Sequence, residues 1–251
     1  MKVNNKLEYC IQYSMCVAGG FIAAYAVLNH ADFLASAQTA NLINIALCIT
    51  GSNWIELCLR LVAVLIYMAG LSVPVIVAKY THINMKMFCI FIEISMIILL
   101  YFFTKRINTI IALYPVFFMT SIQWNSFPGV DGFASSSIFS TNNLRQFTIS
   151  YVEYRCSKDK EHLKKTKFFG GVLLSYHAGV VFSYYMYKWF AMKGVIFCLI
   201  PLFMGMLLLL IESGFLKIVK KEIAAIKHNC NRQKLIRQCQ AVLYGVKKGG
   251  H

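Results

Sequence analysis

An acidic residue inside an apolar run is the strongest chemical signal in this sequence of 251 residues. Glu93 stands between Ile92 and Ile94, and it is the one break in the uncharged run Met87–Thr104. Ionisable groups at membrane depth usually face a bundle interior or a water path. We therefore predict that Glu93 senses or carries a proton. The alternative is a protonated carboxyl group bonded to a neighbouring helix.

His177 is the second candidate for proton coupling, because it also lies in the middle of an apolar run and histidine titrates near neutral pH. A structural role is the alternative for this residue.

Small polar residues recur in two T-x-N segments, Thr39-Ala40-Asn41 and Thr141-Asn142-Asn143. Such side chains cap helices. Two helix N-termini that meet near the bilayer midplane favour an anion. We predict a substrate site here, with helix capping alone as the alternative. The residues predicted to surround the substrate are Gln38, Thr39, Asn41, Gln123, Asn125, Thr141 and Asn143.

Motifs of the common enzyme classes are missing. The sequence has no H-E-x-x-H, no G-x-S-x-G and no P-loop. Histidine and acidic residues are too sparse for a metal cluster, and no pair among the nine cysteines has zinc-ligand spacing. We predict a protein that is not an enzyme and that holds no metal or cofactor.

The composition indicates a membrane protein of the all-α class. Apolar residues make up 58% of the chain and charged residues 14%, against about 25% charged in soluble domains. Several apolar runs approach the ~20 residues that cross a bilayer. We predict a polytopic helical bundle with six spans: Cys10–Leu28, Cys58–Lys79, Met85–Thr104, Ile107–Asn125, Phe168–Trp189 and Val195–Phe215.

The positive charge is concentrated in two segments. Of the 25 Lys and Arg residues, 16 lie in Arg145–Lys167 and Lys217–Lys248. This bias predicts that both termini are cytoplasmic and argues against nucleic-acid binding. We expect a transmembrane domain over residues 1–216 and a basic tail over residues 217–251. The tail has the spacing of an amphipathic helix that lies on anionic lipid, and a solvated helix is the alternative.

An internal repeat relates the two halves of the chain. Leu65–Gly70 and Leu174–Gly179 both read L-x-Y-x-A-G, at an offset of 109 residues, and the T-x-N segments recur at an offset of 102. We predict halves at about 10–104 and 107–215. Three spans in each half make the second half inverted, as in many secondary transporters. We expect a homodimer.

The T-x-N segments leave the number of membrane segments open. Phe33–Thr50 is uncharged and long enough to cross or re-enter, and counting both T-x-N segments as spans gives eight. Charge bias does not choose between six and eight. Arg145 argues against a full crossing by the second segment. We predict six spans and two re-entrant or broken elements.

The sequence resembles the YoaK-like family of small bacterial membrane proteins, a family of unknown function. Gly19-Gly20-Phe21-Ile22 and Gln38-Thr39-Ala40-Asn41 follow its first-half pattern, G-G-[FY]-[IV]-D-A and then Q-T-G-N. Gln123, Asn125 and the second T-x-N segment fall on its G-x-Q-N and T-G-N patterns. Ala23 replaces the family's Asp, Ala40 and Asn142 replace its glycines, and Trp124 separates Gln123 from Asn125. The resemblance implies a six-span protein of the bacterial inner membrane.

Together these observations favour a small secondary transporter or permease for a small solute, with an anion as one candidate. The alternative is a membrane scaffold or regulator that acts through its basic cytoplasmic loop and tail.

Overall fold

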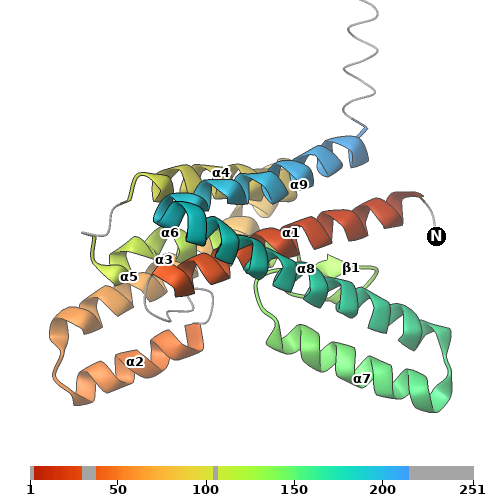
Figure 1. The fold of residues 1–251 in the computed structure, drawn as a ribbon, viewed down its shortest axis with the longest axis horizontal. Coiled ribbons are helices and arrows are strands. Elements are labelled where there is room, and N and C mark those ends of the chain that lie inside the picture. Colours follow the sequence, from red (N-terminus) through yellow and green to blue (C-terminus); the bar gives the residue numbers. More distant parts are fainter. Residues whose placement is uncertain (1–2, 30–37, 104–106, 215–251) are drawn as a thin grey trace, which may run out of the picture. The chain divides into compact units, whose positions relative to one another are not determined.

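The computed structural model describes residues 3–29, 38–103 and 107–214. These residues are almost entirely helical (Figure 1), which confirms the predicted all-α class. The basic tail 217–251 and residues 33–37 of the first re-entrant segment lie outside the described residues. The elements are α1 Val3–Asn29, α2 Gln38–Thr50, α3 Trp54–Tyr80, α4 Met85–Tyr101, α5 Thr109–Ala112, α6 Tyr114–Ser126, β1 Gly129–Val130, β2 Phe133–Ala134, α7 Thr141–Ser157, α8 Lys160–Phe190, the 3-10 helix η1 Ala191–Cys198 and α9 Leu199–Glu212.

Three helical stretches within the described residues are long and apolar enough to cross a membrane. They are Lys6–Asn29, Trp54–Tyr80 and Lys160–Glu212. The third has 53 residues and runs through α8, η1 and α9. About 20 residues suffice for one crossing, so this stretch exceeds what a single span needs. The chain is therefore a membrane protein.

Two of the predicted spans are interrupted helices. The segment predicted at Ile107–Asn125 forms α5 and α6, and Pro115 lies in the first turn of α6. Proline lacks a backbone N–H and suits a helix start. Before the last predicted span, α8 ends at Phe190, and the next residue, Ala191, has a φ of 50°. The chain then continues as the 3-10 helix η1 before α9 begins.

Tight turns fold the chain into two helical hairpins, α2–α3 and α7–α8. Asn53 caps α3, because its Oδ1 accepts a hydrogen bond from the N–H of Glu56 at 3.3 Å. Asp159 caps α8 in the same way, by accepting from the N–H of Glu161 at 3.0 Å. Figure 1 shows the two hairpins at opposite ends of the Met1–Leu209 unit, α2–α3 in orange and α7–α8 in green.

Helices from the two ends of the sequence pack against each other. The first helix, α1, lies along α8, whereas α3 lies along α6. Glycines close both contacts: a Cβ on Gly179 of α8 would meet the backbone of Val17 and Phe21 in α1. A Cβ on Gly70 of α3 would meet Ser121 and the carbonyl of Phe118 in α6. Helices that lack side chains at the contact approach closely, which favours packing in a bilayer.

The chain divides into two compact units, Met1–Leu209 and Leu210–His251. The main core of the first unit is built from α1, α3, α4, α6, η1 and α9 with one residue of α8, and a smaller apolar cluster surrounds Phe168. In the second unit the described part is the last turn of α9 and its end. There Gly214 has a φ of 69°, and its N–H donates to the carbonyl of Ile211.

Candidate functional site

Glu93 lines a small enclosed cavity inside the main core. The cavity holds about 10 Å³, enough for about one water molecule. Two other polar side chains, Thr120 and Gln123 of α6, share it with Glu93, and all three are at most 3% exposed. The full lining is Ala18, Ile22, Glu93, Ile97, Met119, Thr120, Gln123, Cys198 and Leu202. Four helices and η1 thus enclose one acidic group.

The Glu93 carboxyl group forms few hydrogen bonds with the residues around it. The thiol of Cys89, one turn earlier in α4, donates to Oε1 at 3.6 Å. The other oxygen, Oε2, is buried and has no hydrogen-bond partner among the residues the structure describes. No lysine, arginine or histidine in the described part of the chain pairs with this group. An ionised carboxylate without such partners is costly to bury, which favours the neutral, protonated form of Glu93 unless water or a ligand reaches the group.

The polar neighbours in the cavity are held in place by α1 and α6. The amide of Gln123 donates to the carbonyl of Met15 in α1 at 2.9 Å. The hydroxyl of Thr120 donates to the carbonyl of Val116 in its own helix at 2.7 Å. The Gln123 amide and the Thr120 hydroxyl are therefore held in place as donors. The side-chain oxygen of each residue can still accept a hydrogen bond from a molecule bound in the cavity.

Asn41, from the first T-x-N segment, belongs to a polar network in the α2–α3 hairpin. It is 1% exposed, and its Oδ1 accepts a hydrogen bond from Arg60 Nη1 at 3.2 Å. Its Nδ2 donates to Gln38 Oε1 at 3.2 Å. Arg60, itself buried, donates through Nε to Glu56 at 2.8 Å. The network satisfies a buried arginine and joins the two helices, while Thr39 beside it is exposed.

Asn143, from the second T-x-N segment, fastens the loop that precedes α7. Its Oδ1 accepts the N–H of Ser136 at 3.1 Å, and its Nδ2 donates to the carbonyls of Ser136 and Phe139, each at 2.6 Å. The side chain is fully buried, whereas Thr141 is exposed. The N-cap position of α7 is Ser140, which makes no side-chain cap bond.

The structure therefore joins only part of the predicted site. Gln123 shares the cavity of Glu93, and Asn125 is exposed at the end of α6, where its amide donates to the carbonyl of Leu71. His177 is exposed on α8, and its Nδ1 lies 2.8 Å from the carbonyl of Leu173 in the same helix. Within the described residues no hydrogen bond links the Asn41 network to the Asn143 network.

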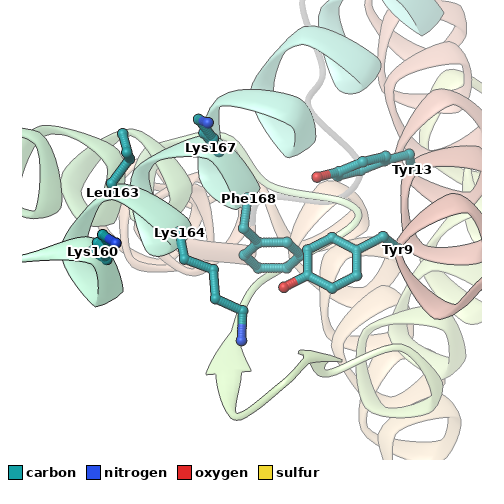
Figure 2. A pocket seen from close by; sticks show the side chains of 7 residues that line it. All are labelled: Tyr9, Tyr13, Lys160, Leu163, Lys164, Lys167 and Phe168. Atoms are coloured by element: carbon teal, nitrogen blue, oxygen red, sulfur yellow. The ribbon is translucent and has the colours of Figure 1, made fainter. Parts of the chain in front are cut away.

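A second pocket, with basic and aromatic walls, lies between the start of α8 and α1 (Figure 2). It encloses about 470 Å³. None of its residues is among those predicted from the sequence, although Lys160, Lys164 and Lys167 have the spacing of one helix face, as do Tyr9 and Tyr13. The full lining is Tyr9, Tyr13, Lys160, Leu163, Lys164, Lys167 and Phe168.

Comparison with known proteins places the chain in a family. The model of the family described as "Protein of unknown function (DUF1275)" matches residues 11–209. The chain belongs to DUF1275. This membership agrees with the YoaK-like resemblance of the sequence motifs. The match covers both hairpins and the cavity of Glu93, so these features lie within the family region. No curated protein and no solved structure matches the chain.

Proposed function

We propose that this DUF1275 protein is a small secondary transporter in which Glu93 couples solute movement to a proton. The observation that carries the proposal is the enclosed cavity where Glu93, Thr120 and Gln123 meet. Membrane-buried ionisable residues commonly mark ion and substrate pathways. The function rests on this acid rather than on the two T-x-N segments, because Asn41 and Asn143 already form hydrogen bonds within the protein.

The proposal includes six spans arranged as two inverted halves. In support, α1 of the first half packs on α8 of the second, and α6 of the second half packs on α3 of the first. The two hairpins lie at opposite ends of the unit in Figure 1, which suits an inverted relation. The glycines of the repeated motif, Gly70 and Gly179, each face the first predicted span of the other half, through α6 and α1 respectively.

Repeat counterparts also meet in the cavity. Ala18 and Thr120 are related by the offset of 102 residues, and Glu93 and Leu202 by the offset of 109; all four line the same space. Counterparts come together only near the axis that relates two repeats. Substrate and coupling-ion sites of repeat-built transporters lie at such interfaces. Leu202 stands at the repeat position of Glu93, so the acidic group belongs to the first half alone, while Thr120 and Gln123 come from the second.

The closed cavity describes an occluded state in this proposal. With room for about one water molecule, it admits a proton or water but no larger solute. Movement of one half against the other would open it to a larger solute, as in alternating access. In this proposal the helices shift at the junction of α5 and α6 and along the 3-10 helix η1, where regular α-helical structure changes.

The test is solute-driven proton movement in liposomes. Purified full-length protein is reconstituted with a pH-sensitive dye inside, and pools of small anionic and neutral solutes are added outside. We expect at least one pool to change the internal pH, and Glu93→Gln to reduce the rate to that of empty liposomes. Glu161→Gln, at an exposed position in the first turn of α8, is the matched control and should retain the rate. Equal rates with Glu93→Gln and the unaltered protein would refute the proposal. If no pool produces a response, the scaffold alternative is favoured.

A further inference from the structure

The basic pocket between α1 and α8 lies where lysines give way to an apolar run along α8. In α8 the first eight residues, Lys160–Lys167, include four lysines, and the apolar run begins at Phe168. In α1 the membrane-spanning stretch begins at Lys6, so Tyr9 and Tyr13 are within its first turns. Tyrosine at such a boundary has its ring at headgroup level.

The floor of the pocket is a rigid aromatic cluster. Phe168 is 1% exposed, and its ring makes an edge contact with Tyr9 at a centroid distance of 5.4 Å. The ring of Tyr13 stacks against it at 6.3 Å, and Phe133 of β2 lies 5.7 Å away. This floor offers an apolar surface to a guest, and its rings are held from three separate elements.

One of the three lysines is already engaged. Lys164 Nζ lies 3.0 Å from Asp131 Oδ2, and the same oxygen accepts a hydrogen bond from the Tyr9 hydroxyl at 2.9 Å. Figure 2 shows Lys164 extending past Phe168 toward Tyr9. Asp131, in the β1–β2 turn, therefore neutralises Lys164 and ties that turn to both helices.

The other two lysines carry uncompensated charge. Lys160 and Lys167 are exposed, line the pocket and have no ion-pair partner among the described residues. The pocket thus combines two available cations with an aromatic floor, close to where the apolar stretches of α1 and α8 begin. A ligand that matches both features carries a phosphate group next to an apolar chain.

We infer that this pocket binds the phosphate headgroup of an anionic phospholipid, with Lys160 and Lys167 as its cationic contacts. The glycerol and first acyl carbons would lie on Phe168 and the tyrosine rings. A soluble phosphate compound shares the headgroup chemistry but makes no use of the aromatic floor. The site is separate from the cavity of Glu93, and it lies in the described part of the chain rather than in the basic tail.

The test is site-mapped photocrosslinking of the full-length protein in neutral detergent. The probe is phosphatidylglycerol with a photoreactive headgroup, and labelled peptides are identified by mass spectrometry. We expect labelling in residues 6–17 and 158–170 that is displaced by unlabelled phosphatidylglycerol. Phosphatidylcholine and glycerol 1-phosphate should compete at least tenfold more weakly. Labelling of the tail serves as an internal reference.

Paired substitutions distinguish the pocket from general charge. One lysine near a membrane surface contributes about a fivefold change in affinity, so Lys160→Gln with Lys167→Gln should weaken pocket labelling by about 25-fold. Lys79→Gln with Lys188→Gln removes the same charge from exposed positions outside the pocket and should leave it unchanged. Equal losses in the two double variants, or undiminished pocket labelling in the first, would overturn the inference. Competition by glycerol 1-phosphate as strong as by the lipid would overturn the lipid assignment in favour of a soluble phosphate.

Discussion

Replacement of Gly179 by alanine tests the contact between α1 and α8. The new Cβ would meet the carbonyl oxygen of Val17 and would lie 2.9 Å from the nitrogen of Phe21. Both atoms belong to the backbone of α1, so no side-chain rotation relieves the clash. Overpacking costs about 1–3 kcal/mol, and this geometry belongs at the upper end. The higher helix propensity of alanine offsets about 1 kcal/mol. The expected net loss is about 2 kcal/mol.

The assay is thermal unfolding in detergent, where this loss corresponds to a fall in Tm of about 4–8 °C for a chain of this size. Gly170→Ala is the control in the same helix. Its Cβ would be 3.3 Å from the edge of the Phe147 ring, which is half-buried and can move. We expect its Tm to stay within about 2 °C of the unaltered protein or to rise. Gly70→Ala should lose less than Gly179→Ala, because the Ser121 hydroxyl can rotate away and one backbone atom, the carbonyl oxygen of Phe118 at 2.8 Å, then remains too close. A Gly179→Ala variant as stable as Gly170→Ala would refute this account of the helix contact.

Three further substitutions separate structural from functional residues. Asn143→Ala removes three buried hydrogen bonds in the loop before α7 and should lower the free energy of unfolding by about 2–4 kcal/mol. Thr141→Ala, at an exposed site, is the control and should change it by less than about 0.5 kcal/mol. Similar losses in the two variants would contradict the role of Asn143 in holding this loop. Glu93→Leu gives position 93 the same residue as its repeat counterpart, Leu202. The free energy of unfolding should rise by about 1 kcal/mol, and solute-driven proton movement should be abolished. A variant that is less stable but still active would count against the proposal. His177→Ala should change neither stability nor the pH dependence of solute-driven proton movement, because the ring is exposed on α8. A shifted pH profile in liposomes would show that His177 takes part in proton coupling.

Much of the helical architecture could be predicted from hydropathy. The predicted span Cys58–Lys79 is within a few residues of α3, and Met85–Thr104 within a few of α4. Apolar runs report burial or lipid contact but not helix continuity. The start of α6 near Pro115 and the end of α8 just before Ala191 therefore escaped prediction, because their causes are local backbone geometry.

The candidate site was predicted only in part. The position of Glu93 in an apolar run signals a buried acid, and the structure adds that Gln123, thirty residues later, shares its cavity. Spacing could not reveal this pairing, because it depends on how α4 packs on α6. The T-x-N motifs have the composition of a binding site. In the structure, however, Asn41 forms hydrogen bonds with Arg60, and Asn143 forms them with the loop before α7. Composition alone does not distinguish a side chain that binds a ligand from one that forms hydrogen bonds within the protein.

The most direct test of the central claim is ligand stabilisation that depends on the Glu93 cavity. Purified full-length protein is screened by thermal shift against small anions and metabolites at pH 5.5 and 7.5. A ligand at 100 times its Kd adds about 2.7 kcal/mol of stability, or roughly 5–11 °C in Tm. The account predicts a ligand whose shift differs between the two pH values and becomes pH-independent in Glu93→Gln. A screen without any shift on well-folded protein, or a pH-dependent shift unaltered by Glu93→Gln, would contradict it.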